Sequence, residues 1–200
     1  PKRNKIELCL HLLRNTIKGS ILIFRRTKFG VNKLEQTLIN NGYKVETLHG
    51  DKSQNDRQTA LNKFKNGYVN ILIATDVAAR GIDINELDAV INFDMPNVPE
   101  TYVHRIGRTG RAGNEGLAIS FCGKDEHPYW KDIMKLIKVD VKTVSEHPYP
   151  WHSGSPETAP ATTKNNSNRS NRPAKKPHNS SRYAKRVDEV SAGGLVIDKT

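Results

Sequence analysis

The amino-acid sequence predicts an α/β fold, with a parallel sheet that carries helices on both faces. The main observation is alternation: apolar runs of about four to seven residues alternate with amphipathic stretches of about ten to fifteen residues. The apolar runs also lack the polar alternation of a half-exposed strand, which indicates strands covered on both sides. Five or six such units within about 140 residues are enough for one domain with its own core.

The first half of the chain is predicted to hold three helices and three strands. Ile6, Cys9, Leu13 and Ile17 form one helical stripe, which ends at Gly19. Ser53, with an aspartate three residues later, is typical of a helix N-terminus. We therefore expect helices at 5–18, 28–40 and 53–66, and strands at 20–24, 44–48 and 70–74.

The second half continues the alternation. We expect a strand at 89–93, a helix that begins near Pro99, a strand at 116–122 and a last helix at 125–138. Polar clusters follow these strands, or lie where the next helix begins. The carboxyl ends of parallel strands form the binding edge of such a sheet, so we expect the clusters to build one site there. They occupy residues 25–28, 49–57, 75–83 and 104–111.

The composition changes after Trp151. Residues 158–187 contain eight basic and no acidic residues, and few large aliphatic ones. Such a segment cannot bury enough apolar area to offset its ordering entropy. We therefore expect a folded domain at 1–150 and a disordered basic tail at 151–190. Residues 191–200 stay unassigned: they look like the start of another strand or domain, with a faint resemblance to the opening strand of Nudix hydrolases.

The net charge of +11 and the pI of about 9.7 indicate an acidic partner, usually nucleic acid. No apolar run approaches the roughly eighteen residues that a membrane span needs, and no signal peptide is visible, so no membrane partner is expected. Cys9 and Cys122 lie in apolar surroundings. They are interpreted as buried thiols of a reducing compartment, neither a disulfide nor a metal pair, which favours a cytoplasmic protein without a metal site.

One stretch, 102–113, combines three arginines at every third position with three glycines. Guanidinium groups cannot be buried unpaired, and glycines weaken a helix, so a plain core helix is disfavoured. The pattern favours a turn whose backbone N–H groups and planar guanidinium groups surround oxyanions, and a solvated basic turn is the alternative. The three arginines are Arg105, Arg108 and Arg111.

Other candidate residues precede this stretch. Gly81 allows a ligand to approach the backbone, and Asp83 suits hydrogen bonds from a ribose, or else a cap or salt bridge. Thr75 offers a phosphate contact or an N-cap. Gln54 and Arg57 share a helical face near a helix N-terminus, where anions are favoured, although an ordinary solvated face fits them as well.

Together these segments resemble the second, C-terminal RecA-like domain of DEAD-box RNA helicases, over roughly residues 1–150. The family's motif IV resembles residues 24–28, and its Q-x-x-R element resembles 54–57. Motif V matches 74–83, and motif VI matches His104-Arg-Ile-Gly-Arg-Thr-Gly-Arg111. The His-Pro-Tyr-containing ends and the basic tail look most like the bacterial RhlE-type subgroup.

The resemblance implies a role for each matching position. Arg108 and Arg111 would be catalytic arginine fingers on the ATP phosphates, and Gly81 and Asp83 would contact the nucleotide sugar. His104 and Arg105 would couple the two domains. The remaining residues would hold the backbone of single-stranded RNA without reading bases; they are Thr27, Lys28, Gly50, Gln54, Arg57, Thr75 and Arg80.

The sequence contains no Gly-x-x-x-x-Gly-Lys-Thr phosphate loop and no Asp-Glu-Ala-Asp box. The resemblance therefore implies an ATP-dependent RNA helicase whose N-terminal RecA-like domain, absent here, holds ATP and Mg²⁺, so that these 200 residues are inactive alone. Ribosome-assembly or RNA-decay complexes are candidate partners. Two alternatives remain: a non-catalytic RNA-binding module, and a DNA translocase of another helicase family, which the histidine-led motif at 104 disfavours.

Overall fold

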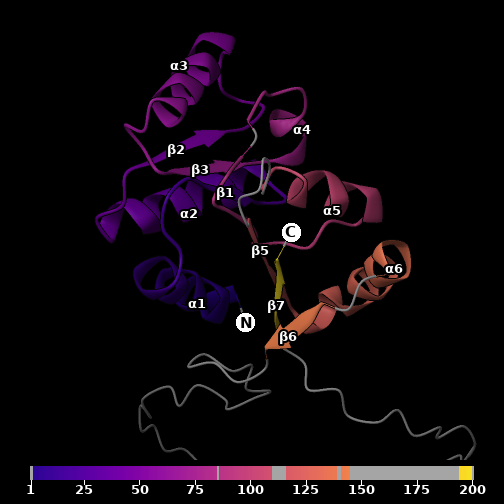
Figure 1. The fold of residues 1–200 in the computed structure, drawn as a ribbon. Coiled ribbons are helices and arrows are strands. Elements are labelled where there is room, and N and C mark those ends of the chain that lie inside the picture. Colours follow the sequence, from indigo (N-terminus) through magenta and orange to yellow (C-terminus); the bar gives the residue numbers. More distant parts are fainter. Residues whose placement is uncertain (1, 85, 110–115, 139–140, 145–193, 200) are drawn as a thin grey trace, which may run out of the picture. The chain divides into compact units, whose positions relative to one another are not determined.

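A computed structural model of the chain describes residues 2–84, 86–109, 116–138, 141–144 and 194–199 (Figure 1). Its strands form one sheet with the order β2-β3-β1-β4-β5-β7-β6. The first five strands in this order are parallel, and β7 runs antiparallel to both β5 and β6. The strands are β1 (Ile21–Phe24), β2 (Val45–Leu48), β3 (Ile71–Ala74), β4 (Ala89–Asn92), β5 (Leu117–Cys122), β6 (Lys142–Val144) and β7 (Gly194–Lys199).

Helices connect the parallel strands. Ser53 caps the N-terminus of α3, where its hydroxyl accepts a hydrogen bond from the Asp56 N–H, as the sequence predicts. α2 and α3 end at Asn41 and Asn66, each next to a glycine with positive φ. The helices are α1 (Lys2–Asn15), α2 (Lys28–Asn40), α3 (Gln54–Lys65), α4 (Asp76–Ala79), α5 (Pro99–Ile106) and α6 (His127–Ile137), with a 3₁₀ turn η1 at Lys124–Glu126.

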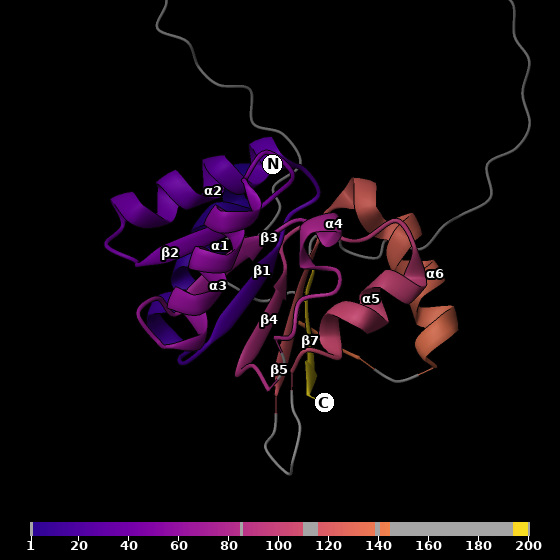
Figure 2. The ribbon, with the colours of Figure 1, turned by 90° about the horizontal axis from the view of Figure 1, so that it is seen from above.

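Helices cover both faces of the sheet, which confirms the predicted fold class. Alternate residues of each strand point to opposite faces. Ile21 and Ile23 of β1 pack in a core with α1 and α2, whereas Leu22 and Phe24 pack in a second core with α3. A third cluster joins α5 and α6, which lie side by side, to β5 (Figure 2).

The predicted helices and strands of residues 5–138 are all present, with ends that differ by a few residues. The short helix α4 lies within the segment that was expected to be a loop, and β6 was not expected. β7 falls within the unassigned residues 191–200 and pairs with β5 of the same sheet. The predicted tail at 151–190 lies outside the described residues, so the domain limits stay predictions.

Both cysteines are buried and free, in agreement with the sequence interpretation. Burial raises the pKa of the Cys9 thiol to about 12, and the positive charge of Arg25 opposes this only in part. Burial, assisted by the negative charge of Glu126, likewise raises the pKa of Cys122 to about 12. Both thiols therefore stay protonated at neutral pH and are inert.

Candidate nucleic-acid and nucleotide interface

Three neighbouring strands end at one edge of the sheet, and the predicted RNA-contacting residues follow them. The register aligns Phe24 of β1 with Ala74 of β3, and Ala74 with Leu48 of β2. Segments that are far apart in the sequence are thereby brought to one edge. The residues placed there are Thr27, Lys28, Gly50, Gln54, Arg57, Thr75 and Arg80.

Motif IV is held at the start of α2. Thr27 is the N-cap, and its Oγ1 accepts a hydrogen bond of 3.0 Å from the Gly30 N–H. The exposed ammonium of Lys28 pairs with Asp51, which follows β2, at 2.9 Å. This hydrogen bond and the positive charge of Lys28 lower the pKa of the Asp51 carboxyl below its ordinary value. A carboxylate thus neutralises one of the cations that was expected to face RNA.

Arg57 is not part of an ordinary solvated face. Its guanidinium is half-buried and donates to the Ala78 carbonyl in α4 at 3.1 Å. It also donates to Gln54 Oε1 at 3.4 Å. The Q-x-x-R element therefore fixes α3 against α4, next to the motif V residues.

Thr75 occupies the N-cap position of α4, but its side chain makes no capping hydrogen bond. Its backbone N–H donates to the Leu48 carbonyl at 3.1 Å, which fixes the residue between β2 and β3. Arg80, at the other end of α4, is exposed. The backbone is positioned here by the sheet, and the hydroxyl is not required for the cap.

Arg105 lies in the interior, where its side chain is 2% exposed. Nε and Nη2 donate to the two carboxylate oxygens of Asp76 at 2.7 and 2.8 Å. Nη1 donates to Asn92 Oδ1 at 3.0 Å and to the Asp94 carbonyl at 2.8 Å. The guanidinium also lies 4.7 Å from the centre of the Phe24 ring. Arg105 therefore joins α4, β4 and α5 within this domain.

The predicted coupling pair is thus split between the surface and the interior. His104 is exposed, but its neighbour Arg105 is buried because its planar fork satisfies the Asp76 carboxylate and the end of β4. A direct contact of Arg105 with another domain does not fit this burial. Any coupling through Arg105 has to pass through Asp76, whose side chain is 34% exposed.

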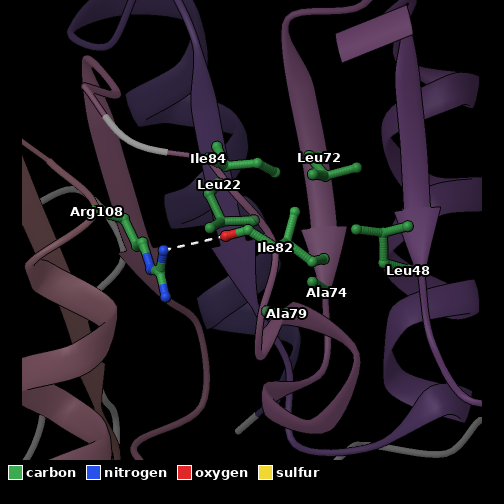
Figure 3. A pocket seen from close by; sticks show the side chains of 8 residues that line it. All are labelled: Leu22, Leu48, Leu72, Ala74, Ala79, Ile82, Ile84 and Arg108. Carbon is green, nitrogen blue, oxygen red and sulfur yellow. Dashed lines mark hydrogen bonds between the residues drawn. The ribbon is translucent and has the colours of Figure 1, made fainter. Parts of the chain in front are cut away.

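Arg108 lies on the face of the sheet that α3 covers. It lines a small apolar pocket whose other walls come from β1, β2, β3 and the segment 79–84 (Figure 3). Arg108 Nη1 donates to the Ile82 carbonyl at 3.2 Å. The pocket is lined by Leu22, Leu48, Leu72, Ala74, Ala79, Ile82, Ile84 and Arg108.

The segment that follows α5 lies beside the residues that precede β4. Thr109 forms a parallel bridge with Leu87, and the Arg108 carbonyl accepts from the Leu87 N–H at 3.1 Å, two residues before β4 begins. Of the cluster at 104–111, Arg105 contacts Asp76 and the end of β4, whereas Arg108 and Thr109 lie beside the segment that precedes β4, and residues 110–111 lie outside the described residues. The physical reason is that α5 returns antiparallel to the strands, about 12 Å for eight residues.

Gly81 and Asp83 lie on the segment between these two regions. Gly81 has φ +74°, which disfavours any side chain there, and a Cβ would meet no other atom within 4 Å. The carboxylate of Asp83 is 86% exposed and pairs with Lys65 at 3.3 Å. An open backbone and an accessible acid thus lie beside Arg108, whereas Arg111 lies outside the described residues.

Arg25, in the polar cluster at 25–28, is largely buried. Its side chain is 15% exposed, stacks 4.2 Å from the centre of the Phe93 ring and pairs with Asp94 at 3.2 Å. Burial lowers the pKa of the guanidinium, and the Asp94 charge opposes this shift. Arg25 therefore fixes the motif IV segment to the residues that follow β4.

A second buried acid supports the same segment. Glu126 accepts hydrogen bonds from the Met95 and Gly123 N–H groups at 3.0 and 2.9 Å. It also pairs with Lys5 of α1 and, at 3.5 Å, with Arg26. The end of β4, the end of β5 and motif IV are thus held together by one carboxylate.

Three residues of this interface were not singled out from the sequence. Asp76 and Asp51 stood within or beside the motifs, but their partners are more than twenty residues away, so no local pattern identifies them. Phe29 had a usable signal: it lies outside the helical stripe of Val31, Leu34 and Leu38, and it is 76% exposed.

Comparison with known proteins agrees with this arrangement. The helicase conserved C-terminal domain matches residues 4–113. The C-terminal domain of the DEAD-box protein Dbp5 is 37% identical, with a TM-score of 0.65 over 69% of this chain and 81% of that one. The Escherichia coli DEAD-box protein SrmB, solved bound to regulator of ribonuclease activity A, is 39% identical, with a TM-score of 0.65 over 68% and 80%.

A third similar structure is that of Saccharomyces cerevisiae Dbp5 bound to RNA and ADP BeF3. It is 38% identical, with a TM-score of 0.62 over 67% of this chain. The match covers 36% of that longer protein. In the described part of this chain, no helix is long and apolar enough to cross a membrane. The chain belongs to the helicase conserved C-terminal domain family, and it is the C-terminal RecA-like domain of a DEAD-box protein.

Proposed function

We propose that this chain is the C-terminal half of an ATP-dependent RNA helicase. In the proposed enzyme, it binds the backbone of single-stranded RNA at its carboxyl edge and supplies arginine fingers to ATP held by an N-terminal RecA-like domain. The observation that carries the proposal is the convergence of three motif segments, from β2, β3 and β1, on one edge next to the Arg108 pocket.

The carboxyl edge is suited to a phosphate backbone. Lys28, Arg57 and Arg80 supply positive charge, the exposed Gly50 leaves its backbone accessible where β2 ends, and the Thr75 hydroxyl makes no capping hydrogen bond. Contacts to phosphate and sugar position a strand but do not read its bases. The proposed binding is therefore independent of sequence, and the RNA dissociates more readily as salt increases.

The residues beside the pocket fit a nucleotide. The exposed carboxylate of Asp83 can accept hydrogen bonds from ribose hydroxyls, and the open space at Gly81 leaves room for the sugar. Arg108 can turn from the Ile82 carbonyl toward phosphate oxygens, where its planar fork is well matched. ATP supplies the phosphoryl group, and Arg108 together with Arg111 stabilises the charge that develops on it.

ATP bound by both domains would close the domains around RNA and bend the bound strand. This bending would separate short duplexes, and ATP hydrolysis would release the separated strands. The phosphate cradle, the Mg²⁺ ligands and the group that orients water belong to the N-terminal domain, so the chain alone is proposed to be inactive. The finer assignments remain part of the proposal: the RhlE-type subgroup, a cytoplasmic location and a partner from RNA decay. The SrmB structure with regulator of ribonuclease activity A suggests the last of these as the first to test.

The experiment measures RNA-stimulated ATP hydrolysis by the protein that carries this chain together with a phosphate-loop domain. Arg108→Ala and Arg111→Ala should each lower turnover by about a thousandfold, the range for arginine fingers. Arg14→Ala is the matched control, because Arg14 is exposed on α1 and its guanidinium donates to Asn41 Oδ1. Normal turnover in both finger variants contradicts the proposed role, and equal loss in the Arg14 variant shows a non-specific effect.

A further inference from the structure

Phe29 is an exposed aromatic residue at the β1 end of the proposed RNA edge. It is the second residue of α2 and is 76% exposed, whereas Val31, Leu34 and Leu38 of the same helix are buried in the core. Side chains of a helix tilt toward its N-terminus, which here lies at the carboxyl end of β1. The phenyl ring is therefore displayed toward the edge that carries the predicted RNA contacts.

The surroundings of Phe29 are charged and polar. Thr27 and Lys28 precede it directly, and Lys28 pairs with Asp51 at the end of the neighbouring segment. Val77, which is 81% exposed, follows β3, the strand that pairs with β1. An exposed aromatic ring beside a lysine suits single-stranded nucleic acid, because the phosphate meets the charge and the base meets the ring.

We propose that Phe29 is a stacking platform for one base of the RNA strand whose backbone lies along Thr27 and Lys28. This inference rests on the proposed function, and it adds a base contact to a site otherwise built for the backbone. Stacking uses the face of the ring, so any base can bind, and a purine with its larger surface binds more tightly than a pyrimidine. Phe29 thereby sets the position of the strand along the edge.

RNA fits this position better than a protein partner. Protein interfaces bury aromatic anchors within a contiguous apolar core from which charged residues are depleted. Lys28 and Asp51, next to Phe29, are 61% and 58% exposed and would both have to be desolvated by an apolar partner. A nucleotide instead leaves its phosphate at the lysine and places only its base on the ring.

The test measures the affinity of the two-domain protein for fluorescently labelled single-stranded RNA. Phe29→Ala should lower the affinity by about tenfold, the range for one stacked base, and Phe29→Trp should retain it. Tyr68→Ala is the matched control, because Tyr68 is an aromatic residue with 71% exposure that lies before β3, at the opposite edge. Circular dichroism of each variant checks that the fold is retained.

A second series uses RNAs with one abasic nucleotide at successive positions. At one position, removal of the base should weaken the wild-type protein but leave Phe29→Ala unchanged, which is the signature of a direct contact. Unchanged affinity of Phe29→Ala, or a loss that is independent of the abasic position, overturns the stacking role. If the loss of affinity is independent of the abasic position and the two domains also close less readily, Phe29 contacts protein and not a base.

Lys28→Ala separates this inference from the proposed function. If Lys28→Ala weakens RNA binding and Phe29→Ala does not, the RNA edge stands and the stacking platform fails. If Lys28→Ala, Arg57→Ala and Arg80→Ala all leave RNA affinity unchanged, the proposed RNA edge itself fails.

Discussion

Asp76 and Arg105 form a two-pronged ion pair between the motif V helix α4 and the motif VI helix α5. The two hydrogen bonds measure 2.7 and 2.8 Å, and the arginine side is buried. Thr75 directly precedes Asp76, and Arg108 follows Arg105 by three residues. The pair thus joins the proposed RNA contacts to the proposed nucleotide contact within one domain.

We expect Asp76→Ala to lower the free energy of unfolding by about 3 kcal/mol, because it leaves a buried guanidinium without its counter-charge. Arg105→Lys keeps the charge but cannot reproduce the fork, so it should also be destabilising. Urea denaturation of the chain measures both effects.

The matched control for this pair is Asp132→Ala. Asp132 pairs with Lys135 on the exposed surface of α6, at 2.8 Å and with 57% and 77% exposure. Such a pair contributes less than about 1 kcal/mol. Equal losses from Asp76→Ala and Asp132→Ala would show that the buried pair is not a structural link.

Asp51 is expected to restrain RNA binding, because it occupies the ammonium of Lys28. Asp51→Asn frees the lysine for a phosphate, and one additional phosphate contact raises the affinity by about fivefold at 0.1 M salt. The affinity is measured by fluorescence anisotropy at several salt concentrations, and the log–log slope should steepen by about 0.7.

The control for Asp51 removes the same charge elsewhere. Asp132→Asn lies on α6, so it should leave both the affinity and the slope nearly unchanged. An equal gain in both variants would mean that only the net charge matters. Lowering the pH does not replace the mutation, since the lowered pKa of Asp51 keeps its carboxylate ionised until the pH falls below the ordinary carboxyl range.

The buried thiols predict how stability depends on alkaline pH. Their pKa values are raised in the folded chain, from 9.0 to about 12, so they contribute stability that is fully present below pH 9 and is lost as the pH rises toward 12. The free energy of unfolding should therefore fall between pH 9 and 11. The double variant Cys9→Ala/Cys122→Ala should show a shallower fall, because these two groups no longer titrate. Identical slopes in both proteins would contradict the assignment.

Local signals in the sequence predict the elements well, because they depend on a few neighbouring residues. Ser53 marks the start of α3, where its hydroxyl accepts a hydrogen bond from the Asp56 N–H, and Gly19, with φ +80°, lies in the connection between α1 and β1. The α/β class follows from the apolar runs, because β1, β3 and β4 are buried along their whole length. These features can be read without knowledge of the partners of any side chain.

The site depends on contacts that no local pattern contains. Arg105 belongs to a run that favours phosphate contacts, and only the position of Asp76, 29 residues earlier, turns it into a buried structural residue. Arg25 is buried for the same reason, through Phe93 and Asp94, which follow β4. Sequence reasoning selected the motif segments, but it could not separate their exposed side chains from those that are buried and hold the others in place.

Arg25 and Gly30 give a prediction in which the sign of a mutation reverses. A Cβ on Gly30 would lie 2.7 Å from Nη2 and 2.9 Å from Nε of Arg25, so the guanidinium would have to leave its position over Phe93. Gly30→Ala should therefore destabilise the wild-type chain, although alanine is favoured over glycine in a helix by about 1 kcal/mol.

The Arg25→Ala background removes the obstacle. Asp94 keeps its hydrogen bond from the Arg26 N–H there, so the single variant should remain folded. In this background, Gly30→Ala should raise the free energy of unfolding by up to about 1 kcal/mol, since only the helix propensity remains. Chemical denaturation of the wild type, Gly30→Ala, Arg25→Ala and the double variant completes the double-mutant cycle. If Gly30→Ala is destabilising by the same amount in both backgrounds, the glycine is not required by Arg25, and the support of motif IV by this arginine has to be reconsidered.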